Sequence, residues 1–571
     1  MKKSVLLVVL SLLAITFISK ASQVENSGKT IWVEKLPIGN NAGDLMSNPV
    51  YIETMTEGIN ATNAVKVSKS GKSVSVTITA GGLSSALTAA ELTSITSLVL
   101  KGTIDARDFK TMRDSMSYLF DIDFSETDIL QYYGKEGTYD TINTSYPANE
   151  IPQYAFGSRN YLKSNKVLNF VNMSLTTNSI GDYAFQYCSN LTSVNIGTSV
   201  VSIGSSAFFD CHSLSSVLIP SLVTRIGYAA FLGDNCLINV DAGNTAFSSI
   251  DGILFDKNQT TLIKLPNNFM GAYTIPLTVS TIANLAFFGC NNLYDVTIPT
   301  TVTNLGSQAF SYCRGLKSIF VPSSVTTMGG FVFMSSSCLI TVDDKNTVYS
   351  SSDGLLFNKP KTYLIQCPTS KYGIYDIPAS VAIFGDMAFE NCSYLTAITI
   401  PASINNIPYG GFENCTGLTS LTIPESVSYI GNSAFYNCSN LTSLYVFTAY
   451  PVNLNYSSNV FYNVNKTNCT LYVPISSMAS FQAATEWKDF TNIVEMTTGL
   501  FPIIQSNIKI MTKDKTLKIS NAKSGSKVKI YTVSGLTVKE KSIENNQTLI
   551  TLPTGVYVLR IGDYSGKIII K

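Results

Sequence analysis

The sequence predicts a mainly β solenoid, built from short stacked units, followed by a small C-terminal β-sandwich. The first observation is a repeat with a 23-residue step: IGDYAFQYCSNLTSVNI starts at Ile180, and IGSSAFFDCHSLSSVLI starts at Ile203. The second is a longer, 102-residue period (steps of 23, 23 and 56), which separates Ile180, Ile282 and Phe384. The third is a change after Met496, where the repeats give way to strand patterns separated by turn signals.

Each 23-residue unit is expected to contain a short strand with one buried face. In the first unit Leu191, Val194 and Ile196 follow an L-x-x-L-x-L type pattern, whose period-two alternation places the apolar residues on one side. A proline such as Pro220 often comes next and stops the strand. One unit cannot bury its own apolar face, so we expect stacked units to share a continuous core.

The two 56-residue steps carry an insertion. The segment Asn244–Pro266 matches Asn346–Pro368. Asp251-Gly252 and Asp353-Gly354 lie beside apolar runs, where a tight turn is favoured, and a second apolar run can pair with the first. We therefore predict a β-hairpin that projects from the stack at each insertion.

The repeat resembles a known family. The pattern Ile-Pro-x-Ser-Val-Thr-x-Ile-Gly-x-x-Ala-Phe-x-x-Cys-x-x-Leu-Thr-Ser, the inserted Ser-x-Asp-Gly-x-Leu-Phe and the closing segment Cys469–Glu495 are similar to the BspA-like leucine-rich repeat family of bacterial surface proteins. The resemblance extends from Ile151 to Glu495. It implies a solenoid that adheres to host proteins or other bacteria, without a bound metal or cofactor.

The C-terminal segment resembles the sorting domain of the type IX secretion system. The similarity lies in Val528-Lys529-Ile530-Tyr531-x-x-x-Gly535, in Leu552-Pro553-x-Gly555-Val556-Tyr557 and in the terminal Lys571. It implies passage across an outer membrane and, often, attachment to the cell surface.

The N-terminus reads as a signal peptide. Met1-Lys2-Lys3 is basic, Val5–Ile18 is apolar and too short to span a bilayer comfortably, and Ser19-Lys20-Ala21 supplies the small residues of a cleavage site. We expect cleavage after Ala21, no transmembrane segment in the mature chain, and a protein that is secreted or held at the outer cell surface.

These signals divide the chain into five expected regions. Two strand-like patterns, one at Leu100 and its counterpart at Phe124, indicate irregular opening repeats, and the exposed end of such a stack needs a cap. The regions are the signal peptide 1–21, the N-terminal cap region 22–93, the opening repeats 94–150, the repeat solenoid 151–496 and the C-terminal β-sandwich 497–571.

Charge argues against nucleic acid as a partner. Charged residues make up only 13% of the chain, and Lys+Arg 39 nearly balance Asp+Glu 38. Phosphate binding needs a concentrated basic surface, which this balance does not favour.

The cysteines recur at one position of the repeat and so form a ladder. They could have a structural role, or they could form disulfides, bind zinc or act as nucleophiles. Disulfides need converging Cβ atoms and zinc needs closely spaced ligands, whereas equivalent residues of a stack lie parallel. We predict buried thiols that act as small apolar residues and resist labelling in the native protein. The cysteines at the repeated position of a unit are Cys188, Cys211, Cys290, Cys313, Cys392, Cys415 and Cys438, while Cys236 and Cys338 are displaced by two.

A phenylalanine recurs at one position in every unit. A binding stripe is conceivable, but the pattern favours a buried aromatic spine. Its members are Phe156, Phe185, Phe208, Phe231, Phe287, Phe310, Phe333, Phe389, Phe412 and Phe435.

Candidates for catalysis are few, and we do not expect an enzyme. His212, the only histidine, follows a ladder cysteine and is interpreted as a solvated loop residue. Asp121 and Asp123 have a spacing that a glycosidase pair could use, yet nothing around them indicates a pocket. Asp114-Ser115-Met116 and Asp140-Thr141-Ile142 resemble a three-residue O-glycosylation signal of some Gram-negative anaerobes.

The outward face of the strands remains as the candidate binding surface. Repeat arrays use such extended faces to bind proteins, so we expect host or bacterial surface proteins as partners; the alternative is a glycan-capturing surface module without catalysis. The candidate ligand face comprises Ser193, Asn195, Ser216, Leu218, Asp295, Thr297, Ser318, Phe320, Thr399, Thr422 and Tyr445, with Ala397, Ser420 and Ser443 in the same row.

Overall fold

The computed structural model describes residues 22–26, 29–33, 72–139, 142–157, 167–496 and, with short gaps, 509–570. The chain divides into two units, residues 1–72 and 73–571. In the first unit β1 (Ser22–Asn26) and β2 (Lys29–Val33) form an antiparallel pair. The signal peptide and its cleavage after Ala21 lie outside the described residues.

The second unit opens with irregular coils that contain its longest helix. Its elements are β3 (Lys72–Ile78), α2 (Leu83–Ala86), α3 (Ala89–Leu92), β4 (Ile95–Ile104), α4 (Ala106–Ser115), β5 (Asp121–Ile129), β6 (Tyr132–Gly134) and β7 (Thr144–Tyr146). Asp105 and Asp108 form a capping box at the start of α4. Strands β4 and β5 pair in parallel with Ser97 opposite Asp121, which confirms the two strand patterns predicted for the opening repeats.

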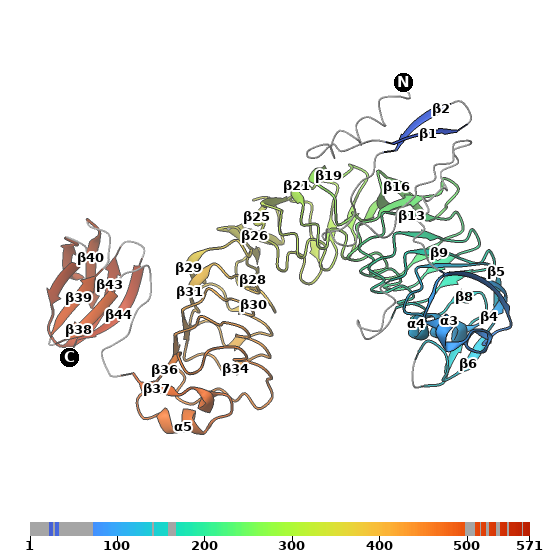
Figure 1. Ribbon diagram of the computed structural model, residues 1–571. Coiled ribbons are helices and arrows are strands. Elements are labelled where there is room, and N and C mark those ends of the chain that lie inside the picture. Colours follow the sequence, from blue (N-terminus) through green and yellow to red (C-terminus); the bar gives the residue numbers. More distant parts are fainter. Residues whose placement is uncertain are drawn as a thin grey trace. The chain divides into compact units, whose positions relative to one another are not determined.

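Each regular coil contributes one strand to each of two rows of parallel strands, and each row is divided into several hydrogen-bonded sheets (Figure 1). The first, which we call the face ladder, continues from β5 through β9 (Phe170–Asn172), β11 (Ser193–Asn195), β13 (Ser216–Ile219), β15 (Leu237–Val240), β19 (Gly271–Thr274), β21 (Leu293–Thr297), β23 (Ser318–Val321), β25 (Leu339–Val342), β29 (Gly373–Asp376), β31 (Leu395–Thr399), β33 (Ser420–Ile423), β35 (Ser443–Val446), β36 (Thr470–Val473) and β37 (Asn492–Glu495).

The second ladder, which we call the turn ladder, consists mostly of two-residue strands around the repeated Ile-Gly. Ser179 and Ile180 pair in register with Ser202 and Ile203, as the 23-residue step requires. Its strands are β8 (Glu150–Ile151), β10 (Ser179–Ile180), β12 (Ser202–Ile203), β14 (Arg225–Ile226), β18 (Thr261–Lys264), β20 (Thr281–Ile282), β22 (Asn304–Leu305), β24 (Thr327–Met328), β28 (Tyr363–Gln366), β30 (Ile383–Phe384), β32 (Asn406–Ile407) and β34 (Tyr429–Ile430).

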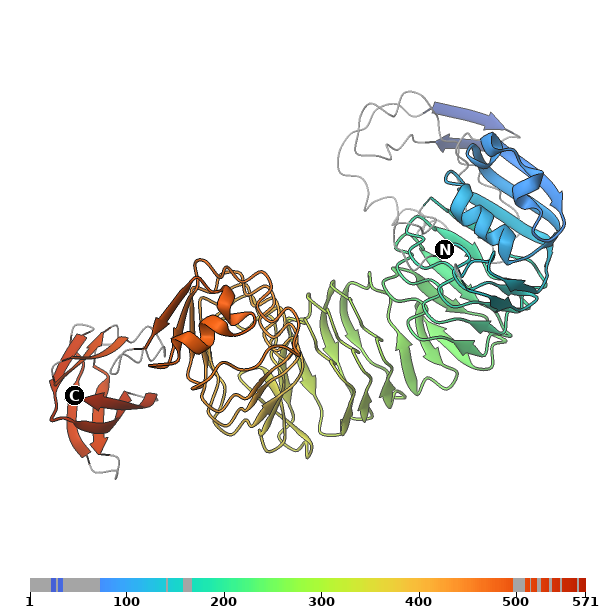
Figure 2. The same cartoon turned by 90° about the horizontal axis from the view of Figure 1, so that it is seen from below.

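Figure 2 shows the coils lying side by side between the helices of the N-terminal end, in blue, and α5 (Met478–Ala483), in orange. Beyond α5 a short 3-10 helix, η3 (Trp487–Asp489), follows. Trp487 and Phe481 are fully buried there, and their rings meet edge to face at 5.4 Å. These aromatic side chains cover the last apolar coil.

The insertions contain the predicted hairpins, but the hairpins do not project. Strands β16 (Phe247–Ile250) and β17 (Ile253–Asp256) form the first hairpin, and β26 (Tyr349–Ser352) and β27 (Leu355–Asn358) form the second. The run after each hairpin, β18 or β28, pairs in parallel with the next turn-ladder strand. Each 56-residue step therefore holds an additional coil, formed by β18 and β19 or by β28 and β29, and the hairpin lies flat between coils.

The buried side chains of the solenoid form three clusters, so the expectation of one continuous core is wrong. The first cluster ends at Leu254, the second runs from Ile253 to Leu356 and the third from Leu355 to Phe490. The strand β17 explains the division, because successive residues of a strand point to opposite faces. Leu254 packs on the preceding coils, whereas Ile253 and Phe255 pack on the following ones.

The phenylalanine spine is confirmed as buried, and it follows the same division. Its rings stack face to face with centroids 4.6–5.7 Å apart within three runs. The runs are Phe156–Phe185–Phe208–Phe231, Phe287–Phe310–Phe333 and Phe389–Phe412–Phe435–Phe461.

All eleven cysteines are buried free thiols, which confirms the predicted burial. Several thiols also donate a hydrogen bond to the phenylalanine carbonyl of the preceding coil: Cys211 Sγ lies 3.2 Å from Phe185 O, and Cys313 Sγ lies 3.0 Å from Phe287 O. The ladder cysteine therefore packs as a small apolar side chain, and its S–H group donates a weak hydrogen bond.

Where the cysteine is displaced, a polar residue takes its place. Asp234 Oδ1 accepts the Cys211 backbone N–H at 2.6 Å, and Ser336 Oγ accepts that of Cys313 at 3.0 Å. Asp234 is buried, and its Oδ2 has no hydrogen-bond partner among the described residues. Burial raises the pKa of the Asp234 carboxyl well above its usual range.

The C-terminal residues form two antiparallel sheets. One contains β38 (Lys509–Lys513), β39 (Thr516–Ser520) and β42 (Gln547–Thr551), and the other β40 (Lys527–Thr532), β41 (Thr537–Ser542), β43 (Gly555–Ile561) and β44 (Tyr564–Ile570). Buried residues of both sheets, such as Leu517 and Val528, belong to one cluster. Tyr557 Oη donates to Pro553 O at 3.0 Å within the quoted Leu-Pro motif, whereas Gly535 and Lys571 lie outside the described residues. Within the described part of the chain, no helix is long and apolar enough to cross a membrane.

Candidate binding face

The face-ladder strands present alternate residues to opposite sides. In β13 and β23 the pattern is exposed, buried, exposed, buried, so that Val217 and Ile319 face the core. Of the predicted candidate residues, Asn195, Ser216, Leu218, Asp295, Thr297, Ser318 and Phe320 are exposed, while Ser193, Thr399 and Thr422 are half-buried.

Two predicted face residues are buried, which corrects the expectation that they point to solvent. Tyr445 is only 9% exposed, because its ring stacks on Tyr472 of the next coil with centroids 4.5 Å apart. Burial raises the pKa of its hydroxyl. Ala397 is buried between Ile374 and Ser420 of the neighbouring strands, since its methyl group is too short to reach beyond them.

The structure adds face residues that the repeat search missed. In β19 Ala272 lies beside Asp295 and Thr274 beside Thr297, and both added residues are exposed. Strand β19 belongs to the additional coil of the first insertion. It pairs with the residues 23 positions ahead, but the segment before it lacks the Ile-Gly-x-x-Ala-Phe-x-x-Cys pattern that defines the repeat. Elsewhere neighbouring coils are tied across the face, as where Asn195 Nδ2 donates to Asn172 Oδ1 at 2.8 Å.

Four of the large apolar side chains exposed on the face-ladder strands form two equivalent pairs, which we call the twin apolar pairs. Leu218 and Leu237 are 42% and 45% exposed, and Phe320 and Leu339 are 51% and 47% exposed. Within each pair the two residues lie diagonally on adjacent strands. The pairs are separated by the 102-residue period, so the same surface feature occurs twice.

A hairpin tip borders each apolar pair. Gly252 O accepts the backbone N–H of Ile238 at 2.9 Å, and Gly354 O accepts that of Ile340 at the same distance. The adjacent Asp251 and Asp353 are exposed, so each pair lies beside one carboxylate. Burial, and after it the charge of Asp251, raise the pKa of the nearby Tyr273 hydroxyl to about 12.

The comparison with known families decides what kind of solenoid this is. The family model described as the BspA type leucine rich repeat region (6 copies) matches residues 149–273, 270–375 and 369–483, which together make up more than half of the chain. The chain belongs to the BspA-type leucine-rich repeat family. The match is to a repeat scaffold and not to a family of enzymes.

Solved structures similar to this BspA-type chain include three bacterial proteins. A leucine-rich repeat protein from Eubacterium ventriosum is 19% identical, with 60% of this chain and 82% of that chain covered and a TM-score of 0.36. A leucine rich cell surface protein from Faecalibacterium prausnitzii is 22% identical (64% and 86% covered, TM-score 0.35). The pneumococcal vaccine antigen PcpA is 16% identical (63% and 87% covered, TM-score 0.34). Among curated proteins there is no significant match.

The thiols of this BspA-type protein are poor nucleophiles. Burial raises the pKa of the Cys290 thiol to about 11 and that of Cys438 to about 12, so the reactive thiolate is scarce at neutral pH. Among the described residues no group of three or more histidine, cysteine, aspartate or glutamate side chains could hold a metal ion.

The remaining candidates have structural partners. His212 is exposed, and its Nδ1 lies 3.1 Å from Gly233 O. Asp123 Oδ1 accepts from both the backbone and the hydroxyl of Ser125, at 2.9 and 2.7 Å, so this carboxylate stabilises the irregular part of strand β5, where the pairing with β4 shifts register. In the glycosylation-like triplets Ser115 is exposed and Met116 buried, Ile142 is exposed, and Asp140 and Thr141 lie outside the described residues.

Proposed function

We propose that this protein is an exported adhesin that binds surface proteins of a host or of other bacteria through the outward face of its face ladder. The twin apolar pairs carry this proposal. Soluble proteins rarely expose large apolar side chains in groups, and such groups surrounded by polar residues are typical of protein-binding sites. Around Leu218 and Phe320 the face offers hydroxyl groups and a single aspartate among the candidate residues.

The duplication of the pairs supports a partner that is itself repetitive or large. Two sites joined by one scaffold bind a partner with two matching epitopes much more tightly than either site alone, because the second contact is intramolecular. Extracellular-matrix proteins and the surfaces of whole cells offer epitopes in this arrangement.

Membership of the BspA-type family supports a place on the outer surface of the cell. The signal peptide with cleavage after Ala21 would direct export, and the C-terminal sheets would serve as a type IX sorting domain. Mass spectrometry of the secreted form tests both steps: we expect an N-terminus at Ser22 and trimming within 497–571. A secreted chain that keeps both ends would contradict the sorting role.

The binding proposal is tested with the full-length protein and two variants. We expect the wild type to bind extracellular-matrix proteins or whole bacterial cells in a pull-down, and the double variant Leu218→Asp/Phe320→Asp to lose that binding, since a charge at each pair must be desolvated. Leu277→Asp is the matched control, because Leu277 is exposed but lies outside the face-ladder strands. The proposal would be contradicted if the wild type bound none of a broad panel of matrix proteins and cells, or if the double variant bound as well as the wild type.

A further inference from the structure

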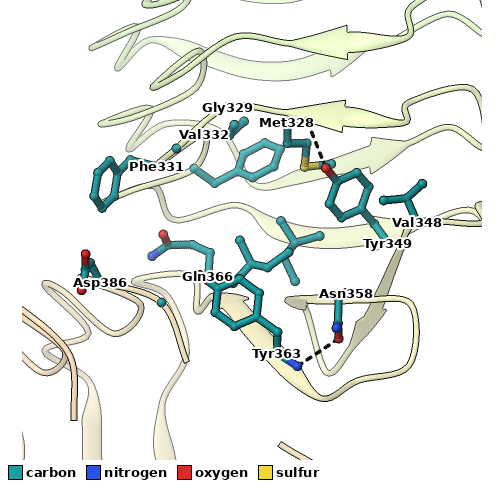
Figure 3. Close-up of a pocket in the computed structure, with 15 residues that line it drawn as sticks. Met328, Gly329, Phe331, Val332, Val348, Tyr349, Asn358, Tyr363, Gln366 and Asp386 are labelled. Atoms are coloured by element: carbon teal, nitrogen blue, oxygen red, sulfur yellow. Dashed lines mark hydrogen bonds between the residues drawn. The ribbon is translucent and has the colours of Figure 1, made fainter. Parts of the chain in front are cut away.

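A pocket of about 380 Å³ lies beside the second insertion (Figure 3). One wall is the coil that follows β24, with Gly330 and Phe331, and the other comes from the inserted strands and the start of the next coil, with Tyr349, Tyr363 and Asp386. Its volume is at the lower end of the range of small-molecule sites, roughly 300–1,000 Å³. It suits a ring-sized ligand better than a protein surface.

The two insertions differ in residues that line this pocket. Gly330 stands where the first insertion has Tyr228, and a Cβ atom added at Gly330 would meet nothing within 4 Å. Aromatic and polar groups are gained at the same place: Phe331, Tyr363 and Asp386 replace Ala229, Thr261 and Asn284. Gly385, which replaces Ala283, is a neighbour of Tyr363. A Cβ atom added at Gly385 would lie only 3.0 Å from Tyr363 Oη, so the change to glycine makes room for the tyrosine.

Several polar atoms of the pocket lack a protein partner. Gln366 is 3% exposed, and its Nε2 donates to Cys367 O and Ala388 O, both at 3.2 Å. Its Oε1 accepts no hydrogen bond from the described residues, and Figure 3 shows the amide group directed toward the space between Phe331 and Asp386. This amide oxygen can therefore accept a hydrogen bond from a ligand in the pocket.

The tyrosine hydroxyls complete the set of polar groups. Tyr349 Oη accepts the Met328 backbone N–H at 3.0 Å, so its own proton is free to donate. Burial, and after it the charge of Asp386, raise the pKa of the Tyr363 hydroxyl, which keeps that proton available as well. The pocket therefore combines two acceptors, Gln366 and Asp386, with two hydroxyl donors.

We propose that this pocket binds a hexopyranose ring of a glycan. A sugar ring donates hydroxyl protons to Asp386 and Gln366, accepts from the tyrosine hydroxyls, and packs its apolar C–H face on an aromatic side chain such as Phe331. An organic cation would satisfy the acceptors but would meet the two hydroxyl donors with no acceptor of its own. The pocket lies apart from the twin apolar pairs in its residues, so the inference is independent of the proposed protein-binding face.

The experiment uses the full-length protein and a set of methyl hexopyranosides, the α- and β-glycosides of glucose, galactose, mannose and N-acetylglucosamine, measured by isothermal titration calorimetry. We expect at least one to bind. Tyr363→Thr and Asp386→Asn each copy the residue of the first insertion at a position that lines the pocket, and each should weaken binding by about tenfold or more. Gly330→Ala is the matched control and should bind as the wild type does, because its methyl group enters open space.

Other results would overturn the inference. These are binding that is unchanged in both Tyr363→Thr and Asp386→Asn, absence of binding to every glycoside, and binding of tetramethylammonium in place of the sugars. Leu218→Asp/Phe320→Asp should keep its sugar binding, so a failure of the adhesin proposal leaves this result intact. A thermal unfolding curve for each variant shows that the protein tested is folded.

Discussion

The substitution Phe310→Ala removes the middle ring of the second phenylalanine run. Phe310 is fully buried, and its ring stacks on Phe287 at 4.6 Å and on Phe333 at 5.6 Å. Truncating a buried phenylalanine costs about 3–5 kcal/mol of unfolding free energy, and more where the surroundings cannot collapse into the cavity. Because both neighbouring rings are fixed by their own coils, we expect the upper part of that range, about 4–5 kcal/mol, which raises the local opening equilibrium about a thousandfold.

The buried cysteines report this opening coil by coil. Native-state thiol labelling, read out by mass spectrometry of the peptides, measures how often each thiol is exposed. In the wild type all eleven thiols should resist labelling until the protein is denatured, since all are buried. In Phe310→Ala the thiols of the second cluster, Cys290, Cys313 and Cys338, should be labelled about a thousandfold faster.

The division of the core at β17 and β27 makes the result specific. Cys211, in the first cluster, and Cys415, in the third, should keep their wild-type rates. Phe320→Ala is the control of the same residue type: Phe320 is exposed on β23, so its loss should leave all rates nearly unchanged. Equal acceleration of all thiols would refute an energetic division at the hairpins, and unchanged labelling of Cys313 would refute the supporting role of the spine.

Two further predictions concern single buried or strained positions. The folded protein binds the proton of Asp234 more tightly than the unfolded chain does, so the unfolding free energy should fall as pH rises above about 4. Asp234→Asn removes this titration and should gain stability over the wild type between about pH 4 and 7, measured by denaturant unfolding; a constant difference across that range would contradict the raised pKa. Gly354→Ala places a side chain at φ +81°, 2.7 Å from Leu339 Cδ2, and should cost about 1–2 kcal/mol or more in unfolding free energy. Gly330→Ala, which meets no atom, should be nearly neutral in the same assay, and equal effects of the two would refute the steric argument.

The regular coils could be predicted from the sequence in detail. A 23-residue step gives each position the same neighbours one coil away, so a residue such as Phe208 inherits the environment of Phe185. The period-two strand pattern then fixes which side chains face the core. For this reason the burial of the spine and of the thiols was predicted correctly, and seven of the residues predicted for the candidate face are exposed, while its role in binding stays a prediction.

The insertions could not be predicted in the same way. A turn signal such as Asp251-Gly252 predicts a hairpin, but not whether the hairpin projects or packs flat. That depends on the parallel pairing of Leu262 with Ile282, a shorter step along the chain than the one between regular coils. One signal was present: Ile253, Leu254 and Phe255 are three successive apolar residues, which indicates a strand buried on both faces.

Departures from the step also explain the misplaced face residues. Tyr445 is covered because the next face strand, β36, pairs Thr470 with Ser443, a longer step than the regular one, and so brings Tyr472 opposite Tyr445. The repeat pattern does not predict that these two tyrosines stack. The residues of β19 and β29 were missed for a different reason. These strands pair with residues 23 positions ahead, but the segments before them lack the Ile-Gly-x-x-Ala-Phe-x-x-Cys pattern of the repeat.

The two insertions show how a repeat scaffold acquires sites that its regular coils lack. In the first, Lys264 is buried, its Nζ lies 2.6 Å from Asn267 Oδ1, and burial lowers its pKa, in the same part of the core where burial raises the pKa of Asp234. In the second, Gln366 and Ser336 occupy these two positions, and no ionisable group remains at either. The exchange of lysine for glutamine removes the need for a buried counter-charge and places an amide group in the lining of the pocket. A position that serves only stability in one copy can in this way supply a binding group in the other, because the hairpin holds both copies in the same backbone frame while the side chains diverge.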